Sequence, residues 1–294
     1  MIKAVLGGGI TSLIYLYYNK NFFSLTDQVG GQMSSSFDLG PRYLHNKSKY
    51  VTDFLQSLDI PIEHKTIKIG YLCDNGWVEN PDLEFRQKYY MKSRGVKDIS
   101  GFDYTVLNMN TKEFVVCNID FKKLVEKLFD KVASRIYISP VIKIDLVEQL
   151  IFCDHMKVKY DNLVSTIPLN IFCKLSNLNQ KLESISMTYC LMSQDFFDLE
   201  NYDYVYDNRT TTNFHRMTKS KKGIVCDILE SNKKDFLKTN KVIEHKTISN
   251  AQIISLDKDF KLKEHSEVRF IGRYGAWNRR WKTETIIEEV QKHE

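Results

Sequence analysis

Apolar and polar positions near the start of the chain predict a strand, a turn, a helix and a second strand. Residues 2–6 form a short apolar run that ends at three glycines, as a buried strand followed by a turn does. Residues 10–18 then predict a helix, and residues 22–26 predict a strand. This order of elements is the βαβ unit of a dinucleotide-binding sheet.

The strongest helical pattern lies over residues 120–133, where apolar side chains recur every three or four positions. Weaker patterns predict helices over residues 50–58 and 283–290, and strands over 163–166 and 267–271. Several further strands are expected within residues 180–230, and a small meander over 136–160. Residues 66–116 are expected to be irregular, with short strands.

Together these elements predict an α/β fold in which both ends of the chain build one domain. We expect a Rossmann-like dinucleotide-binding domain, with a parallel sheet and a small β-meander, and an inserted mixed α+β substrate domain. The nucleotide domain is expected to comprise residues 1–48, 117–170 and 250–294, and the substrate domain residues 49–116 and 171–249.

The composition is that of an ordinary globular protein with a mild positive charge. Among 294 residues, 43% are hydrophobic and 27% are charged, and the formal net charge is +5. This charge suits an anionic small molecule such as a nucleotide and is too small to indicate a nucleic acid partner. The six cysteines form no CxxC motif, which favours reduced thiols in a cytoplasmic protein. The apolar stretch over residues 10–18 is too short to span a bilayer, and no metal-ligand spacing is present.

The first turn, Gly7-Gly8-Gly9-Ile10-Thr11-Ser12, directly follows the predicted first strand. A dinucleotide site uses G-x-G-x-x-G/A there, because the first glycine makes the turn, the second admits the pyrophosphate and the third lets the helix pack on the strand. Gly7 and Gly9 fill the first two places, and Ser12 is a small residue in the third. The helix N-terminus adds N–H donors for phosphates. A plain strand-to-helix turn is the alternative.

A second glycine pair follows the second strand, in Asp27-Gln28-Val29-Gly30-Gly31-Gln32. Adjacent glycines let the backbone pass close to a bulky ligand or adopt a positive φ. Asp27 is a candidate for the adenosine ribose, because an acid at the end of the second strand binds it in these folds. The alternative for Asp27 is a solvent-facing turn residue.

Six segments stand in a family's order along the chain: Gly7-Gly8-Gly9, Gly30-Gly31, Gly40-Pro41-Arg42-Tyr43-Leu44-His45, residues 160–169 with Thr166-Ile167-Pro168-Leu169, Phe214-His215-Arg216-Met217-Thr218, and Gly272-Arg273-Tyr274-Gly275-Ala276-Trp277. Together they resemble the FAD-binding flavoprotein superfamily of amine oxidases, UDP-galactopyranose mutases and protoporphyrinogen-oxidase-like proteins. The resemblance touches both ends and the middle of the chain.

The resemblance implies FAD as the cofactor, bound by the domain that the two chain ends build. By position it implies these contacts: Gly7, Gly9, Ile10, Thr11 and Ser12 at the pyrophosphate, Asp27 at the ribose, Gly30, Gly31 and Gln32 along the ribityl and phosphate portion, Gly40, Pro41, Arg42 and Tyr43 near the isoalloxazine, Gly272 and Arg273 on the other side of the pyrophosphate, and Thr166 and Trp277 within the matching segments. The helix beginning near Thr283 would direct its N-terminus at the flavin pyrimidine edge.

The chain departs from the family at three points. The family places a Glu at the end of the second strand, where this chain has only the later Asp27. Bacterial mutases carry a His beside the flavin where this chain has Arg42. The chain is also shorter than the usual members, which implies a reduced substrate domain.

The catalytic candidates are Arg42, His45 and Arg216. Arg216 suits an anionic substrate, because a guanidinium binds phosphate through two donors, and an ion pair is the alternative. His45 lies either near the flavin or in a hydrogen bond within its own loop. The basic, aromatic stretch over residues 86–94 is interpreted as a solvated helix face rather than an anion site.

The sequence predicts an FAD-dependent oxidoreductase of the amine-oxidase-like class, in which flavin N5 accepts a hydride from a substrate carbon bearing an amine or a similar group. A UDP-galactopyranose-mutase-like enzyme acting on a sugar nucleotide, with no net redox change, is the first alternative. A non-catalytic FAD-binding protein is the second. The substrate is expected to be a small molecule, anionic or nucleotide-linked.

Overall fold

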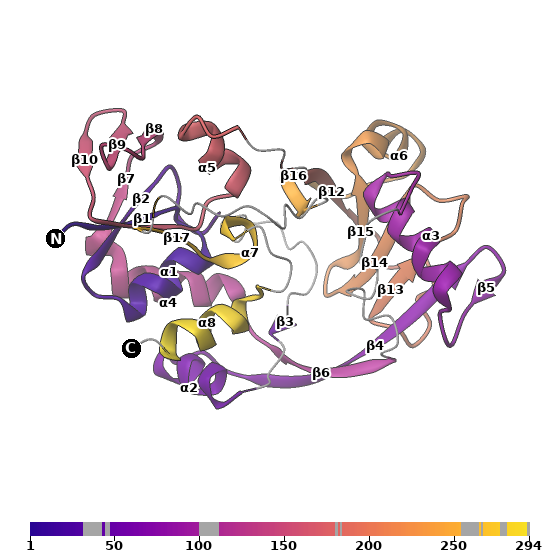
Figure 1. Ribbon diagram of the computed structural model, residues 1–294. Helices are drawn as coiled ribbons and strands as arrows, with labels where there is room; N and C mark the ends of the chain where they lie inside the picture. Colours follow the sequence, from indigo (N-terminus) through magenta and orange to yellow (C-terminus); the bar gives the residue numbers. More distant parts are fainter. Residues whose placement is uncertain are drawn as a thin grey trace.

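The computed structural model describes residues 1–31, 43–44, 48–99, 112–179, 182, 184–253, 265, 267–276 and 281–292. The chain forms two lobes, one around a parallel sheet and the other around a larger mixed sheet (Figure 1). Both chain ends lie in the first lobe.

The first lobe is built on five parallel strands: β1 (Lys3–Leu6), β2 (Phe22–Thr26), β7 (Ile136–Ile138), β11 (Asn162–Ser165) and β17 (Val268–Phe270). Their order across the sheet is β17-β11-β1-β2-β7. Helix α1 (Ile10–Tyr18) carries the chain from the end of β1 back to the start of β2. Because parallel strands all end at one edge, the turns after β1, β2, β11 and β17 meet there.

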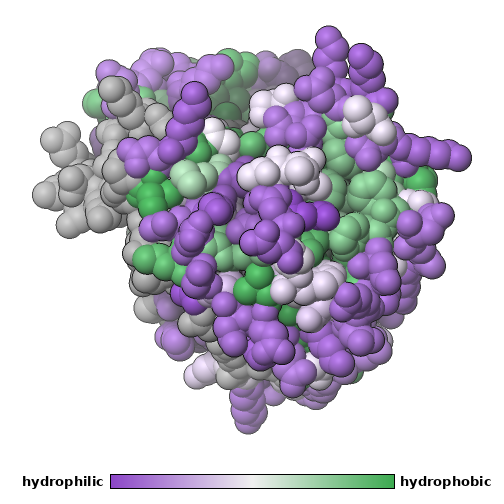
Figure 2. Space-filling view, turned by 90° about the vertical axis from the view of Figure 1, so that its right-hand side faces the viewer, coloured by the Kyte–Doolittle hydropathy of each residue, from purple (hydrophilic) through white to green (hydrophobic). Residues whose placement is uncertain are grey.

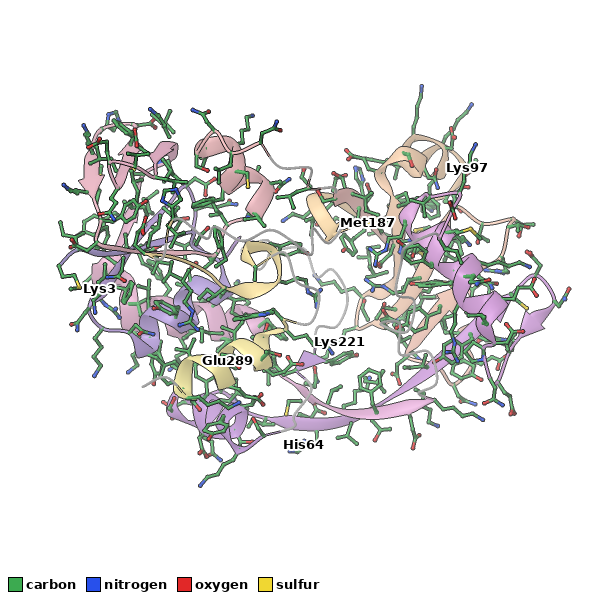
Figure 3. All side chains as sticks on the ribbon, in the orientation of Figure 1. Lys3, His64, Lys97, Met187, Lys221 and Glu289 are labelled. Carbon is green, nitrogen blue, oxygen red and sulfur yellow. The ribbon has the colours of Figure 1, made fainter. Side chains whose placement is uncertain are left out.

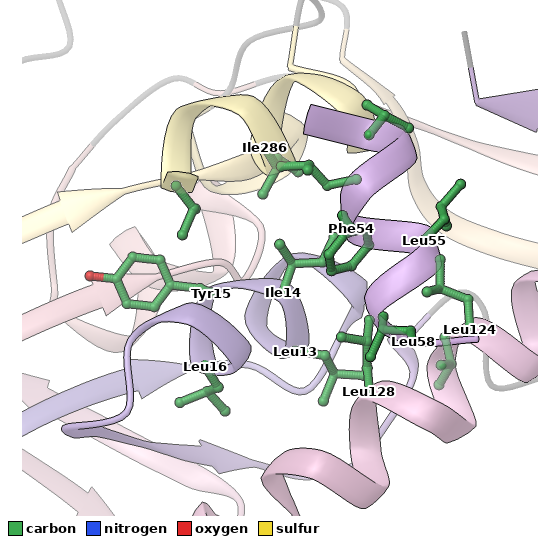
Figure 4. Packing of buried hydrophobic residues seen from close by; sticks show 14 of the residues in the cluster. Leu13, Ile14, Tyr15, Leu16, Phe54, Leu55, Leu58, Leu124, Leu128 and Ile286 are labelled. Carbon is green, nitrogen blue, oxygen red and sulfur yellow. The ribbon is translucent and has the colours of Figure 1, made fainter. Parts of the chain in front are cut away.

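Successive residues of β1 point to opposite sides of this sheet and enter two cores. Val5 packs with four helices, whose apolar faces meet around Ile14, Phe54 and Ile286 (Figure 4). Ala4 and Leu6 pack on the other side, against a three-stranded antiparallel meander and a short helix. The helices of the first core are α1, α2 (Lys49–Ser57), α4 (Phe121–Val132) and α8 (Thr283–Lys292). The meander on the other side consists of β8 (Val141–Asp145), β9 (Leu150–Cys153) and β10 (Lys157–Lys159), and the short helix is α5 (Leu169–Leu175).

The second lobe contains a mixed sheet whose main path runs β16-β12-β15-β14-β13-β4-β6-β3, with β5 paired to β4. Its strands are β3 (Tyr43–Leu44), β4 (Glu63–Cys73), β5 (Gly76–Trp77), β6 (Glu113–Asn118), β12 (Ser184–Met192), β13 (Tyr204–Asp207), β14 (Phe214–Ser220), β15 (Gly223–Leu229) and β16 (Glu244–Ile253).

Two helices cover opposite faces of this sheet. Helix α3 (Leu83–Arg94) begins where the Asp82 carboxylate accepts a hydrogen bond from Phe85 N, and it packs Tyr89 over the sheet. Helix α6 (Lys233–Thr239) places Phe236 against the other face. The outer surface of this lobe is mostly hydrophilic, with scattered apolar side chains (Figure 2).

Two contacts between the lobes are visible among the described residues. The antiparallel pair of β4 and β6 runs along one side of the molecule from the first lobe into the second (Figure 1). At the far end of the large sheet, the hydroxyl of Tyr274, in α7 (Gly272–Gly275), donates to the carbonyl of Ala251 at 2.8 Å. The C-terminal part of the chain therefore contacts both sheets.

The structure confirms the predicted βαβ unit, the long helix near residue 120, the meander and the terminal helix. It corrects residues 66–116, which were expected to be irregular and instead contribute to β4, α3 and β6. It also corrects the solvated helix face, since Tyr89 and Tyr90 are buried in α3. Sequence reasoning did not find β16, whose residues include Lys246, Thr247 and Asn250 and so lack a clear apolar alternation.

The cores show where two helices near the expected domain boundaries pack. Val51, Phe54 and Leu55 of α2 belong to the first-lobe core, and Leu169 and Phe172 of α5 also pack in this lobe. We propose that the boundary between the two domains follows these cores, so that α2 and α5 belong to the domain of the first lobe. Among the described residues, no helix combines the length and the apolar character needed to cross a membrane.

Candidate dinucleotide-binding site

The turn after β1 is built so that a side chain on either of the first two glycines would clash with its surroundings. Gly7 has φ +111°, and a Cβ there would lie 2.5 Å from Thr166 Oγ1. A Cβ on Gly8 would overlap the carbonyl oxygen of Gln28. A Cβ on Gly9 would meet nothing within 4 Å among the described residues, so space is open above this position.

The second glycine pair lies against the first. Gly9 and Gly30 form a parallel bridge, and Gly30 N donates to Gly8 O at 2.7 Å. Gly31 has φ +53°, and a Cβ there would lie 3.1 Å from the Gly9 Cα. The two glycine segments that the sequence singled out therefore meet in space with almost no side chains between them.

The C-terminal glycine segment closes the same edge from the other side. Gly272 has φ +81°, and a Cβ there would lie 2.9 Å from the side chain of Thr11. A Cβ on Gly275 would lie 2.7 Å from Ser165 O. Arg273 between them is exposed. Both extremities of the chain thus build one edge, as predicted.

Helix α1 presents its N-terminus at this edge. Gly9 is its N-cap, no side chain caps the first turn, and that turn carries no acid. The first N–H groups of a helix lack partners within the helix and carry partial positive charge. Ile10, Thr11 and Ser12 therefore offer backbone donors of the kind that bind phosphate oxygens.

Hydroxyl groups that are buried or partly buried hold this turn, and sequence reasoning recognised only part of their role. Ser12 Oγ lies 2.6 Å from Thr166 Oγ1, which donates to Leu6 O at 2.8 Å. Ser24 Oγ donates to Gly7 O at 2.7 Å. Ser12 was predicted as a small residue and Thr166 as part of a family segment, whereas Ser24 was missed. A hydroxyl residue inside the apolar run of β2 was the available signal.

The acids near the edge differ in burial. Asp27 is exposed directly after β2, at the edge where the glycine segments meet. Glu284, in the first turn of α8, is buried, and its pKa is raised by that burial despite the positive charges of Lys282 and Arg273. Sequence reasoning did not single out Glu284, because nothing in a terminal amphipathic helix marks one of its acids as buried.

Several predicted site residues lie outside the described residues: Gln32, Gly40, Pro41, Arg42, His45 and Trp277. Tyr43 is described, and it is half-buried in β3, where it pairs with Asn118 of β6.

Arg216 of β14 is held within the second lobe. Its guanidinium forms an ion pair with Asp227 of β15 and donates to the hydroxyl of Tyr204 at 2.7 Å. Asp227 is buried, whereas about a quarter of the Arg216 side chain is exposed (28%). The structure therefore shows the ion pair that was the alternative to a free anion-binding cation.

A β-bulge places His215 on the same face as Arg216. The pairing register with β15 shifts between Phe214 and Arg216, and Phe214 and Met217, three residues apart, both pack on the α6 side. His215 lies on the α3 side, with its ring against Tyr89. Burial and then the nearby cations Arg216, Lys92 and Arg94 lower the pKa of His215 well below its ordinary value.

A row of polar side chains crosses the sheet on this face. Lys246, Tyr189, Asp227, Arg216 and Tyr206 are successive partners across β16, β12, β15, β14 and β13. Side chains in such a row are neighbours about 5 Å apart. The row combines two cations, one buried acid and two phenols on one surface.

The carboxyl edge of the first sheet faces the second lobe. Lys3, at the start of β1, lies on the outer side of the first lobe, so β1 runs toward the second (Figure 3). Lys221, at the tip of the β14–β15 hairpin, and Met187 of β12 lie on the side of the second lobe that faces the first (Figure 3). No group of three or more His, Cys, Asp or Glu side chains able to hold a metal occurs within the described ranges.

Solved structures share this fold over nearly the whole chain. A reduced UDP-galactopyranose mutase superposes with a TM-score of 0.71 at 13% identity, covering 99% of this chain and 92% of that one. A putrescine oxidase bound to putrescine gives 0.66 at 9% identity, covering 99% and 97%. An oxidoreductase from Methanosarcina mazei gives 0.66 at 10%, covering 100% and 99%. No family model and no curated protein matches the sequence. The structural likeness confirms the predicted fold class.

Proposed function

We propose that this protein is an FAD-dependent oxidoreductase of the amine-oxidase-like class. The observation that carries the proposal is the meeting of Gly9, Gly30–Gly31 and Gly272 at the carboxyl edge of the parallel sheet, with no described atom within 4 Å of a Cβ built on Gly9. Backbone without side chains at a helix N-terminus is what a long diphosphate-linked ligand requires. The fold shared with a mutase and with oxidoreductases supports the same assignment.

The residues of the edge have distinct roles in this proposal. The first N–H groups of α1 bind the pyrophosphate, and Gly9 leaves room for its approach. Gly30 and Gly31 line the path of the ligand on one side, and Gly272 and Arg273 line it on the other. Asp27 is the acid placed to accept hydrogen bonds from the ribose. When bound, the flavin supplies the capacity to accept a hydride from a substrate carbon.

The polar row of the second lobe is the proposed substrate surface. It lies on the sheet that stands opposite the carboxyl edge, and it offers the exposed part of the paired Arg216 guanidinium and the partly exposed Lys246 to an anionic group of a small molecule. Asp227 and Tyr204 fix the orientation of Arg216, so the guanidinium needs no reordering when a ligand arrives. The six free cysteines support a cytoplasmic location as part of the proposal.

A mutase-like enzyme acting on a sugar nucleotide is the second candidate. The structural likeness to UDP-galactopyranose mutase and the two cations of the polar row favour it. Turnover that needs a reductant but consumes no oxygen would identify this chemistry. Bound flavin that neither a reductant nor any substrate changes would instead identify a non-catalytic FAD-binding protein.

The test is the absorbance spectrum of the purified full chain before and after gel filtration. We expect a flavin spectrum that stays with the protein peak, or that appears after incubation with FAD. FMN is the control, because it lacks the adenosine diphosphate portion that the glycine edge is proposed to bind. A protein that stays colourless with FAD, or that binds FMN equally well, contradicts the proposal.

A further inference from the structure

Ser12 departs from the glycine motif, and its small size alone does not explain why this residue is a serine. It is completely buried in the first turn of α1, at the place where the motif has glycine or alanine. Smallness lets the helix approach the strand, and alanine would serve that purpose equally well. A serine therefore adds something that the packing does not require.

The hydroxyl groups of this region form a directed chain. Thr166 Oγ1 donates its single proton to Leu6 O at 2.8 Å, so the contact of 2.6 Å with Ser12 Oγ has Ser12 as the donor. The chain runs from Ser12 to Thr166 to the carbonyl of Leu6. It joins the first turn of α1, the end of β11 and the last residue of β1.

These three segments are the walls of the glycine turn. A Cβ on Gly7 would lie 2.5 Å from Thr166 Oγ1 and 3.3 Å from Ser12 Oγ, so the two hydroxyls enclose the residue that makes the turn. Gly7 is also held from the β2 side, where Ser24 Oγ donates to its carbonyl at 2.7 Å. The backbone that must admit a diphosphate is thus fixed by side-chain hydroxyls.

We propose that Ser12 and Thr166 are positioning residues for the dinucleotide turn, and that their hydroxyl chain sets the affinity for the cofactor. This inference rests on the proposed FAD function. In this inference Ser12 is not merely tolerated in place of glycine. Replacing it with the alanine or glycine of the motif weakens cofactor binding. The hydroxyls act through the backbone and do not touch the ligand.

The experiment measures the dissociation constant of FAD for the full chain by flavin fluorescence. We expect Ser12→Ala and Thr166→Val each to raise the constant about fivefold or more, since Ser12→Ala removes the bond from Ser12 to Thr166 and Thr166→Val removes that bond and the bond to Leu6 O. The double variant should exceed the larger single effect by less than twofold, because both changes break one chain. Thr166→Ser keeps the hydroxyl and should restore the parent value.

A matched control lies in the second lobe. Thr188 is buried, and its hydroxyl lies 2.9 Å from that of Thr247, far along the chain from the glycine turn. Thr188→Val should lower the melting temperature and leave the FAD constant unchanged. An FAD constant for Ser12→Ala within twofold of the parent value overturns the proposal, and so does an equal shift in Thr188→Val.

Hydrogen exchange of the ligand-free chain separates this inference from the proposed function. Loss of the hydroxyl chain should speed exchange of the amides over residues 6–13 in Ser12→Ala, with no change over residues 184–192. If the parent chain binds no FAD, the proposed function fails while the exchange result still decides whether the hydroxyls hold the turn. Unchanged exchange over residues 6–13 overturns the positioning role whatever the ligand is.

Discussion

Three consecutive residues of the first turn are glycine for three different physical reasons. Gly7 needs a positive φ, Gly8 needs space that the Gln28 carbonyl occupies, and Gly9 has neither constraint. At Gly9 the backbone is extended, with φ −74° and ψ 175°, which any residue can adopt. Neither the backbone conformation nor a contact with a described residue requires glycine at this position, and the proposed ligand passing over it would.

Gly9→Val should therefore separate binding from stability. We expect retention of FAD to be lost while the free energy of unfolding changes by less than about 1 kcal/mol, because the new side chain enters open space. Gly8→Ala is the contrasting variant, since its Cβ would overlap a carbonyl and should cost about 1–3 kcal/mol. Denaturant titration measures the free energy of unfolding of each variant, and flavin absorbance measures how much FAD each variant retains. A Gly9→Val protein that holds FAD like the parent contradicts the site.

His215 makes the stability of the second lobe depend on pH. In the unfolded chain its imidazole binds a proton near the ordinary pKa of about 6.5. In the folded protein, burial and then Arg216, Lys92 and Arg94 lower the pKa well below that value, so the ring stays neutral. Stability is thus present above pH 6.5 and is lost as the pH falls below it.

The measurement is the free energy of unfolding at pH 7.5 and at pH 5.5. We expect His215 to account for about 1.4 kcal/mol of the loss between these values, the energy of one pKa unit. His215→Gln should remove that part of the pH dependence. His245→Gln, which changes an exposed histidine of β16, should leave it in place. Equal pH profiles for the parent and His215→Gln would show that the imidazole is not kept neutral.

At the scale of elements, the two ends of α1 differ: its N-terminus is the proposed ligand site, and its C-terminus is closed by the protein. Its N-terminus has no capping side chain. At its C-terminus, Arg135 donates to the carbonyls of Leu16 at 2.7 Å, Asn19 at 3.0 Å and Phe22 at 3.1 Å. A cation at this end offsets the negative pole of the helix and satisfies carbonyls that lack partners.

Arg135→Ala should destabilise the protein without affecting the ligand site. Loss of hydrogen bonds from a charged donor should lower the free energy of unfolding by about 2 kcal/mol. The FAD constant should stay at the parent value, because the change lies at the opposite end of α1. Lys131→Ala, on the exposed side of the neighbouring α4, is the control and should change neither quantity. A weakened FAD affinity in Arg135→Ala alone would mean that the two ends of α1 are coupled.

The sequence made the elements of the first lobe predictable because they are local. The run before Gly7 and the helix over residues 10–18 each follow from adjacent residues, and the structure has them at nearly the expected bounds. The stretch over residues 66–116 failed because β4 is stabilised by partners far along the chain, in β6 and β13. The helix α3 looked solvated because its basic residues hid the buried tyrosines.

The candidate site was predictable only where glycines mark it. Gly7, Gly9, Gly30 and Gly272 stand out in a sequence, and their meeting follows from the parallel sheet. The hydroxyl chain, the Arg216–Asp227 pair and the burial of Glu284 depend on contacts between distant segments. No local pattern distinguishes a serine that donates to another strand from one that is merely small.

At the scale of the whole molecule, the C-terminal segment bonds the two lobes to each other. The Tyr274 hydroxyl donates to Ala251 O at 2.8 Å, and its ring packs near Leu169 and Cys173. Tyr274→Phe keeps the ring and removes this bond. We expect a loss of about 1 kcal/mol in the free energy of unfolding.

The control for Tyr274→Phe is Tyr137→Phe, which removes the hydroxyl from a half-exposed ring on β7. That variant should unfold like the parent in a denaturant titration. A Tyr274→Phe protein that also unfolds like the parent would show that the bond to Ala251 adds nothing to the joint between the lobes.

The position of β17 at the edge of the first sheet has a consequence for synthesis on the ribosome. The ribosome synthesises β1, α1 and β2 first, but β17, which pairs with β11 at the edge of their sheet, and helix α8, which packs on α1, come from residues beyond 267. Helices α2 and α4 reach the core of α1 earlier, so only the part of its apolar face under α8 stays uncovered until nearly all of the polypeptide is made, an arrangement that slows folding and favours protection by a chaperone until translation ends.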